Sequence, residues 1–355
     1  MKNLINLNEV DHTKEPIFFG QPLNLERYDR FRYPNYFEMF RNQIQAFWTP
    51  EEIDLTKDKL DYKNLTEHEQ FIFTSNLKYQ ILLDSVQARG IPHLTEDLSN
   101  PEVEAFCSWW AAFEQLHSYS YTYIIKNVYP SPGIVFDNIL NNEKIIQRTV
   151  SATKYYDDLI NSMGDSVEER KKKLLLTLMS INILEGVRFY VSFACSFAFA
   201  ENGRMEGNAK TIKFIARDEM LHLGFTQHLL RTLKNKKEEG FTDIWKELEP
   251  TLVKMFEDSA EEEMQWADYL FADGSMLGLN AEILKKFMKY LVNDRMKAVG
   301  LTPIFEKTKN PIPWINSWLS NDAVQPAPQE TEITSYNVGA IKSDLGDADF
   351  GDFDF

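Results

Sequence analysis

The 355-residue sequence predicts an all-α fold, organised as one large helical domain with a shorter segment at each end. Hydrophobic residues make up 43% of the chain and aromatic residues 13%, which is enough to fill one large core. Glycine and proline are sparse through the middle, where apolar residues recur at helical spacing and strand-type alternation is weak. We therefore expect an N-terminal arm over residues 1–35, a helical domain over 36–320 and a flexible, disordered tail over 321–355.

The helices of the central domain are expected where apolar spacing is bounded by glycine, proline or polar residues. The first should end at Thr49-Pro50 and the second at Gly90, and a later helix should break at Pro250. In chain order, the expected helices cover residues 36–48, 67–89, 102–128, 141–163, 167–200, 208–234, 241–271 and 280–299.

The charge of the chain argues against direct binding to nucleic acid. The formal net charge is −16 and the isoelectric point is near 4.9, so the surface repels phosphate backbones. The two cysteines, Cys107 and Cys195, each lie in an apolar run and are expected to be buried, reduced thiols. This cysteine usage suits a cytoplasmic protein, and the N-terminus lacks the apolar core of a signal peptide.

Residues 174–200 are long and apolar enough to span a bilayer. Asn182, Glu185 and Arg188 lie near the centre of this stretch, however, and a charge there costs at least about 3 kcal/mol in a membrane. We therefore expect a buried central helix and no membrane partner.

Two Glu-x-x-His motifs lie inside strongly apolar predicted helices. Positions i and i+3 share one face of a helix, so each motif can offer a carboxylate and an imidazole to one metal centre. A single motif of this kind has little weight, because glutamate is common. The two motifs are Glu114 with His117, and Glu219 with His222.

A lone acid precedes each motif on the preceding apolar helix, Asp84 before the first and Glu185 before the second. An unpaired buried carboxylate is costly, and the doubled pattern matches the ligand plan of di-iron and di-manganese helical bundles. Four carboxylates and two imidazoles suit two Fe or Mn ions better than zinc, which takes fewer ligands. The alternative is a set of buried ion pairs, which one motif would favour and the doubled arrangement disfavours.

Tyr121 is the candidate for redox chemistry at this centre. It follows His117 by four residues, so it lies on the ligand face one turn away. A tyrosine beside an oxidising metal pair can lose an electron and a proton. Tyr119 and Tyr123 point to the other side of an ideal helix and are poorer candidates.

A tyrosyl radical survives only in a dry and inert pocket. Phe189 and Phe193 follow Glu185 at helical spacing, and Ile215 precedes Glu219 by four residues, so all three side chains can wall such a pocket. An apolar stripe alone would more often be ordinary core. Asp218, next to Glu219, is a candidate partner for the free N–H of a metal-bound histidine. A surface or ion-paired aspartate is an equally good interpretation of Asp218.

From Asn321 the chain is rich in Asp, Ser, Gln, Pro and Gly, and it ends in GDADFGDFDF. Such a composition cannot bury enough surface to order itself. Acidic stretches punctuated by phenylalanine are typical of tails that dock on a partner, and the alternative is a tail that only solvates the protein.

Several stretches resemble the small subunit of class I ribonucleotide reductase, and the similarity extends from about residue 18 to the end. The six candidate ligands and the tyrosine at this offset are highly specific to that family. The stretches are RYDRFRYP, FWTPEEIDL, LLDSVQARG, FEQLHSYSYTYII, EGVRFYVSFACSFAF, FIARDEMLHL and SYNVGAI.

The resemblance implies a ferritin-like helical bundle with additional helices, which forms a homodimer and activates dioxygen at two Fe ions, with Mn possible. Trp110, one turn before Glu114, would support the ligands. The metal nearer Tyr121 would be bound by Asp84, Glu114 and His117, and the other by Glu185, Glu219 and His222.

The resemblance also implies roles outside the metal ligands. Tyr121 would carry the stable radical, and Trp48, Asp218 and His117 would begin a proton-coupled electron route. Tyr336 in the tail would pass the oxidising equivalent to the large catalytic subunit, on which the C-terminus docks. The family position of Tyr119 is not usually aromatic, which leaves open a second oxidisable residue.

Two other functions compete with this interpretation. A ferritin-like oxidase acting on its own small substrate would not need Trp48 together with a tail tyrosine. An iron-storage or purely structural bundle is usually built from a shorter chain without a docking tail.

Overall fold

The computed structural model describes residues 6–320 of the chain. The expected tail over 321–355, with Tyr336, lies outside the described residues. Between residues 6 and 320 there is no β-strand, only two isolated β-bridges, so the expected all-α class is confirmed.

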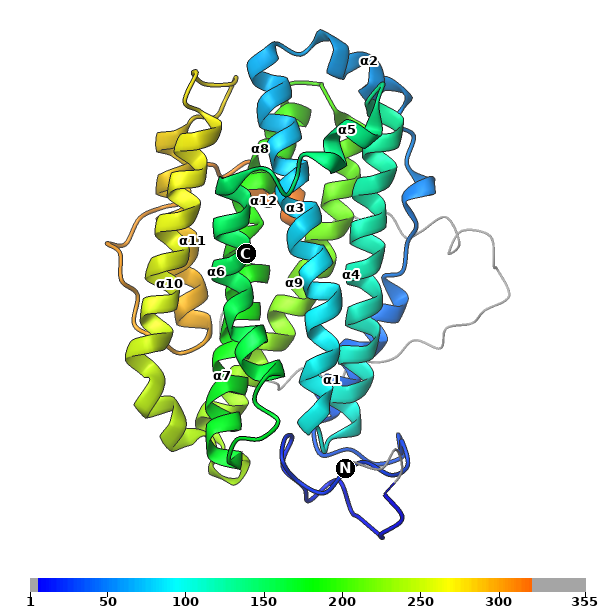
Figure 1. The fold of residues 1–355 in the computed structure, drawn as a ribbon, viewed down its shortest axis with the longest axis vertical. Helices are drawn as coiled ribbons and strands as arrows, with labels where there is room; N and C mark the ends of the chain where they lie inside the picture. Colours follow the sequence, from blue (N-terminus) through cyan, green and yellow to red (C-terminus); the bar gives the residue numbers. More distant parts are fainter. Residues whose placement is uncertain (1–5, 321–355) are drawn as a thin grey trace.

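The long helices run side by side along the long axis of the molecule (Figure 1). A short π-helical turn, Leu184–Arg188, separates two of them. The helices are α1 Pro34–Gln45, α2 Thr56–Asn64, α3 Glu67–Leu94, α4 Pro101–Val128, α5 Pro132–Asp137, α6 Glu143–Ile160, α7 Val167–Ile183, α8 Tyr190–Glu201, α9 Glu206–Asn235, α10 Thr242–Leu270, α11 Ala281–Ala298 and α12 Ile315–Leu319.

Side chains at the helix starts explain where the main elements begin. The Thr66 hydroxyl accepts a hydrogen bond from the Glu69 amide of α3, and Asn100 does the same for the Val103 amide of α4. The start of α9 is capped from another element, because the buried Asp58 of α2 accepts a hydrogen bond from the amide of Gly207 at 3.0 Å. The short helix α2, which the sequence did not predict, therefore fixes the start of α9.

The helix end expected at Gly90 and the helix break expected at Pro250 are both wrong. Helix α3 continues through Gly90 to Leu94, because Gly90 is a packing site: a Cβ there would lie 2.3 Å from a ring carbon of Tyr156. Helix α10 continues through Pro250, which lies on its exposed side. Water can bond the carbonyl that the missing N–H of this proline leaves free.

The apolar stretch that resembles a membrane span is a core segment. Its most apolar window, within Val167–Glu201, is 94% buried inside the molecule. The expectation of a central buried segment is confirmed, although the predicted continuous helix over 167–200 is interrupted by the π-helical turn. Cys107 and Cys195 are buried and free of disulfides, as expected.

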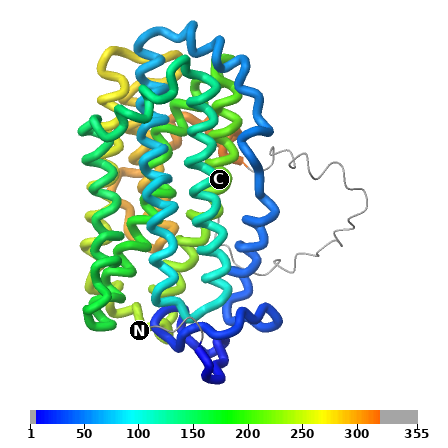
Figure 2. Tube along the Cα trace, turned by 45° about the vertical axis from the view of Figure 1, so that its right-hand side comes forward, coloured from blue at the N-terminus to red at the C-terminus, as the bar shows by residue number. Residues whose placement is uncertain are grey.

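The N-terminal arm lies at one end of the bundle, as Figures 1 and 2 both show. Its main anchor is Glu239, which follows α9. Glu239 accepts hydrogen bonds from the Ile17 amide at 2.7 Å and the Tyr33 hydroxyl at 2.6 Å, and it pairs with Arg32 at 2.9 Å. One buried carboxylate thus joins two parts of the arm to the helical body.

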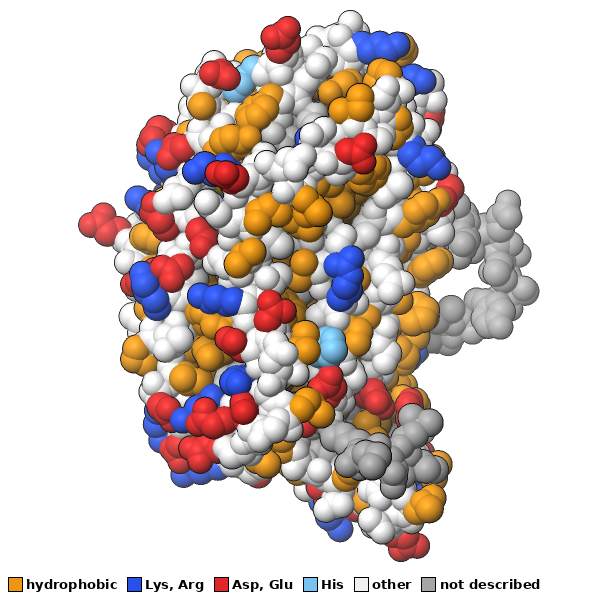
Figure 3. Space-filling view, in the orientation of Figure 1, with side chains coloured by type: hydrophobic (Ala, Val, Ile, Leu, Met, Phe, Trp, Pro, Cys, Tyr) orange, Lys and Arg blue, Asp and Glu red, His pale blue; other side chains and the backbone are white. Residues whose placement is uncertain are grey.

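Acidic and basic side chains are intermixed over the side of the molecule formed by α10 and α11 (Figure 3). Several are paired, such as Lys254 with Asp258 at 2.8 Å and Lys285 with Asp268 at 3.0 Å. This face presents no continuous basic strip of the kind that binds nucleic acid.

Candidate metal centre

The six sequence-predicted ligands meet in the middle of the bundle, although they come from four separate segments. Each of them has no exposed surface. They are Asp84 from α3, Glu114 and His117 from α4, Glu185 from the π-helical turn, and Glu219 and His222 from α9.

The ligand atoms form two overlapping groups, in each of which all atoms lie within 4.8 Å of one another. One contains Asp84 and His117, and the other contains Glu185 and His222. Glu114 and Glu219 belong to both groups. The family resemblance implied one metal for each glutamate, whereas in the structure Glu114 and Glu219 each lie within reach of both positions.

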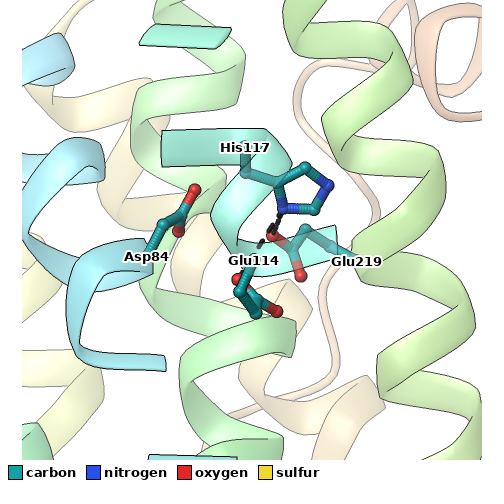
Figure 4. Close-up of side chains that lie close together, drawn as sticks. All are labelled: Asp84, Glu114, His117 and Glu219. Atoms are coloured by element: carbon teal, nitrogen blue, oxygen red, sulfur yellow. Dashed lines mark ion pairs between the residues drawn. The ribbon is translucent and has the colours of Figure 1, made fainter. Parts of the chain in front are cut away.

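Each histidine contacts the glutamate of the other motif. His117 Nδ1 lies 3.1 Å from Glu219 Oε1, and His222 Nδ1 lies 3.3 Å from Glu114 Oε1. Figure 4 shows His117 and Glu219 pointing toward each other from facing helices, with Glu114 below and Asp84 approaching from the other side. Helices α4 and α9 therefore contribute to one joint site.

The cluster holds more negative charge than its two imidazoles can balance. Burial and the neighbouring Glu114 carboxylate raise the pKa of Glu219 to about 8. Burial also raises the pKa of Asp84 and of Glu185 well above the usual range, and nearby carboxylates add to both shifts. For Glu114 the effect of burial is outweighed by His117 and His222, which hold its pKa at about 2.

Several buried ligand atoms lack a hydrogen-bond partner among the described residues. They include both carboxylate oxygens of Asp84, Oε2 of Glu114 and of Glu185, and Nε2 of His222. Buried polar atoms are normally bonded, so this concentration of unpaired carboxylate oxygens beside histidine nitrogens indicates a site for cations. The donor set of four carboxylates and two imidazoles fits two Fe or Mn ions.

Tyr121 lies on α4 beside this cluster and has no exposed surface. Burial, and then the charge of Asp84, raise the pKa of its hydroxyl well above the usual value. The two side chains do not form a hydrogen bond of ordinary geometry. The phenol therefore stays protonated in an apolar interior, close enough to the ligands to feel their charge.

The other two tyrosines of this helix lie outside the core. Tyr119 is 47% exposed and its hydroxyl donates to Glu51. Tyr123 is half-buried and donates to the carbonyl of Ile53 at 3.3 Å. Both differ from Tyr121 in facing away from the cluster.

The three residues expected to wall the radical pocket, Phe189, Phe193 and Ile215, are fully buried. The rings of Phe189 and Phe193 stack at 5.6 Å. Their common role around Tyr121 stays a prediction.

A short hydrogen-bonded connection leads away from the cluster. Asp218 Oδ2 accepts from Trp48 Nε1 at 2.7 Å and lies 3.2 Å from His117 Nε2. The other oxygen of Asp218 accepts from Arg217 at 3.0 Å. The sequence left Asp218 open between two interpretations, and the structure places it between the ligand histidine and the buried tryptophan.

Sequence reasoning missed two residues next to the centre, Gln87 and Tyr156. Gln87 donates to Glu185 and accepts from the Tyr156 hydroxyl. A signal for Gln87 was available, because it follows Asp84 by three residues and shares its helix face. Trp110, as expected, contacts the ligands: its Nε1 donates to Glu114 Oε1 at 2.7 Å.

Comparison with known proteins identifies the family of this chain. The family model described as ribonucleotide reductase, small chain, matches residues 26–311. The chain belongs to this family.

Individual relatives agree over nearly the whole length. The ribonucleoside-diphosphate reductase subunit beta of Haemophilus influenzae is 48% identical over 367 residues, which cover 98% of this chain and 97% of that protein. The ribonucleoside-diphosphate reductase 1 subunit beta of Escherichia coli O157:H7 is 48% identical over 364 residues, covering 97% and 96%. The enzyme class is therefore ribonucleoside-diphosphate reductase, beta subunit.

A solved structure confirms the ferritin-like helical fold. The ribonucleotide reductase R2 subunit from Clostridium botulinum superposes with a TM-score of 0.82 at 29% sequence identity. The match covers 90% of this chain and 98% of that one.

Proposed function

We propose that this chain binds two metal ions in the buried cluster and uses dioxygen to generate a radical on Tyr121, which drives ribonucleotide reduction on a large subunit. The observation that carries the proposal is the joint site itself. Six buried ligand side chains form two overlapping metal positions, and a fully buried tyrosine lies on the same helix as two of them.

The proposed ions are Fe, and the donor set is compatible with Mn as well. When bound in the reduced state, the pair would supply electrons that activate dioxygen, and dioxygen would be the source of the oxidising power. The protein contributes the position and charge of the ligands. Glu114 and Glu219 would help to hold both ions, because they belong to both groups, whereas Asp84 and Glu185 each belong to one group.

Tyr121 would give up one electron and its hydroxyl proton. Three features of this chain suit that role. The phenol is buried and protonated, its ring is sealed from water, and its hydroxyl has no hydrogen-bond partner of ordinary geometry among the described residues. Phe189, Phe193 and Ile215 would keep the surroundings free of oxidisable or protic groups.

Trp48, Asp218 and His117 would begin the route by which the oxidising equivalent leaves. The indole N–H and the imidazole share the oxygen Asp218 Oδ2, so a change of charge on Trp48 is felt at the ligand His117. Tyr336, which lies outside the described residues, would continue the route to the large subunit.

Membership of the small-subunit family implies pairing with a large subunit and homodimerisation. We place the docking contact in the C-terminal tail, whose aromatic residues would anchor it while its acids steer it. The enzyme would act in the cytoplasm.

The test is to add ferrous iron and air to the metal-free protein and record optical and EPR spectra. A sharp tyrosyl signal that is absent from Tyr121→Phe would support the proposal. A product oxidised in the absence of any large subunit would indicate a self-contained oxidase, and iron accumulation without a radical would indicate storage.

The tail is tested separately. Removing residues 347–355 should abolish binding to the large subunit and leave the Tyr121 signal unchanged. Tyr336→Phe should keep binding but stop turnover, because phenylalanine is too hard to oxidise. Normal nucleotide reduction by either variant at low subunit concentration would contradict these roles.

A further inference from the structure

The two lone acids of the cluster are held in different ways. Neither oxygen of Asp84 has a hydrogen bond of ordinary geometry in the described part of the chain, although the Tyr121 hydroxyl lies close to this carboxylate. Oε1 of Glu185, in contrast, accepts a hydrogen bond from the amide group of Gln87. Among the described residues, a hydrogen bond of ordinary geometry therefore orients Glu185, and none orients Asp84.

A third residue, Tyr156, extends this hydrogen-bonded arrangement. The side-chain carbonyl of Gln87 accepts a hydrogen bond from the hydroxyl of Tyr156 on α6. Gln87 has no exposed surface and Tyr156 is 4% exposed, so water does not compete for these groups. We call Tyr156, Gln87 and Glu185 the Tyr156 string.

The string has one direction of donation. A metal ligand is ionised, and an ionised carboxylate can only accept, so the NH₂ group of Gln87 faces Glu185 and its carbonyl faces Tyr156. The Tyr156 hydroxyl then satisfies the carbonyl that this orientation leaves in the interior. Without that hydroxyl, the side-chain carbonyl of Gln87 would be buried with no hydrogen bond. The orientation in which its NH₂ group donates to Glu185 would then be less stable.

The backbone that carries Glu185 is fixed independently of the string. Arg188, in the same π-helical turn, pairs with Glu262 of α10 at 2.6 Å. Arg295 of α11 donates to the carbonyl of Gly186 at 3.3 Å. Two helices that carry none of the six ligands thus hold the turn, and the remaining freedom of Glu185 is the rotation of its side chain.

That rotation decides which oxygen faces the metal position. Because Gln87 engages Oε1, Oε2 of Glu185 is the oxygen left without a hydrogen bond, and it lies 3.9 Å from Nδ1 of His222. We call the ligand group that contains Glu185 and His222 the second metal position. The string therefore holds one oxygen of the Glu185 carboxylate by a hydrogen bond and leaves the other oxygen free to face this position.

We propose that Tyr156 is a positioning residue for the second metal position: through Gln87 it sets the Glu185 carboxylate for one-oxygen binding of the metal. The inference rests on the proposed metal centre and extends it. Its consequence is a difference between the two positions. Affinity at the second position depends on the string, and affinity at the position of Asp84 and His117 does not.

The experiment is an anaerobic titration of metal-free protein with Mn(II), followed by calorimetry and EPR. Two adjacent Mn(II) ions couple magnetically, whereas a single bound ion gives an isolated six-line signal. Tyr156→Phe should weaken the second binding step by about 3–10-fold, below the 10–100-fold typical of direct partners of a ligand. The first step should stay within about 2-fold, and the isolated signal should grow at intermediate loading.

Tyr155→Phe is the matched control, because it removes the same hydroxyl from the neighbouring residue of α6, outside the string. This control should bind Mn(II) as the parent does. Gln87→Leu should weaken the second step by about 10–100-fold. In the Gln87→Leu background, adding Tyr156→Phe should have almost no further effect, because the string is already broken.

Two results for Tyr156→Phe alone would overturn the inference. One is a second binding step equal to that of the parent, and the other is equal weakening of both steps, which marks a general loss of packing. Additive effects of Tyr156→Phe and Gln87→Leu would also contradict it. If the parent itself binds fewer than two Mn(II) ions, the proposed metal centre fails, and this outcome is distinct from failure of the string.

Discussion

The two halves of the metal centre have the same sequence pattern and different structures. Asp84 and the Glu114 motif lie on the regular helices α3 and α4, whereas Glu185 lies in a π-helical turn between α7 and α8. Such turns insert one residue into a helix and often occur at functional sites. A repeated motif therefore predicts which residues are candidate ligands but not how each side chain is held.

The two halves also differ in the residues that hydrogen-bond to their ligands. His117 of the first half is joined through Asp218 to Trp48, so this side offers a path for charge. Glu185 of the second half is joined to Gln87 and to a turn that Arg188 fixes from outside. We interpret the first half as the side through which an electron and a proton would move. We interpret the second half as the side where hydrogen bonds and ion pairs fix the position of a ligand.

The largest expected effect comes from removing a ligand that the halves share. Glu219→Ala should weaken both metal positions by at least about 100-fold, since even changes beyond the ligands cost 10–100-fold in affinity. The measurement is metal content per chain after desalting, together with the EPR signal after iron and air. Full loading with an intact radical would show that Glu219 is not a shared ligand.

The next largest effect is expected for Tyr121→Phe, which separates radical formation from metal binding. Tyr121→Phe should abolish the tyrosyl signal and nucleotide reduction while both metal positions still fill. Its stability cost should be at most about 1 kcal/mol, because the hydroxyl has no partner of ordinary geometry. EPR and thermal unfolding measure the two outcomes. An unchanged signal would move the radical to another residue, with Tyr119 the first to test.

Sequence reasoning located all six candidate ligands because buried charges stand out in apolar helices, and helical spacing is regular enough to place them on one face. The same reasoning gave the all-α class and most long helices. It separated Tyr121 from Tyr119 and Tyr123 by the turn of one helix, and in the structure Tyr121 is buried while the other two are at least partly exposed.

The rest depends on contacts between distant segments. Gly90 has the sequence signature of a helix end, and only the ring of Tyr156 against it explains why the helix continues. The π-helical turn has no local signal, because it is stabilised by Glu262 and Arg295 from later helices. The sharing of Glu114 and Glu219 between both positions likewise follows from how α4 and α9 face each other.

The charge of the cluster predicts a pH dependence that metal should remove. Glu219 titrates at about 8 when folded and near 4.5 when unfolded, so the folded, metal-free protein binds more protons between these values. Its unfolding free energy should therefore fall as pH rises from about 5 to 8, by up to about 1.4 kcal/mol per pH unit for each such group. The raised pKa values of Asp84, Glu185 and His117 act in the same direction.

Urea unfolding at several pH values measures this slope. Metal-loaded protein should lack it, because bound ligands are deprotonated, so the stabilisation by metal should grow with pH. Glu219→Gln, which removes one titrating group, should show a shallower slope than the metal-free parent. A metal-free parent whose stability is flat or rises over this range would contradict the excess of buried carboxylates.

The smallest expected effect comes from Gly90→Ala, which tests whether the packing of the Tyr156 ring against Gly90 helps to position Glu185. In Gly90→Ala the new methyl group would lie 2.3 Å from the Tyr156 ring, so the ring must move, and we expect this movement to break the hydrogen bond from its hydroxyl to Gln87. Overpacking of this kind costs about 1–3 kcal/mol, and the better helix propensity of alanine returns about 1 kcal/mol. The net loss in unfolding free energy should be on the order of 1 kcal/mol.

The matched control is Gly224→Ala, at a helical glycine of α9 where an added Cβ meets nothing within 4 Å. That change should stabilise the protein by up to about 1 kcal/mol. Gly90→Ala should in addition weaken the second Mn(II) binding step as Tyr156→Phe does, and Gly224→Ala should not. If Gly90→Ala lowers stability but leaves the second step intact, then the ring of Tyr156 can move without releasing Glu185, and the support of the second half resides in the fixed π-helical turn alone.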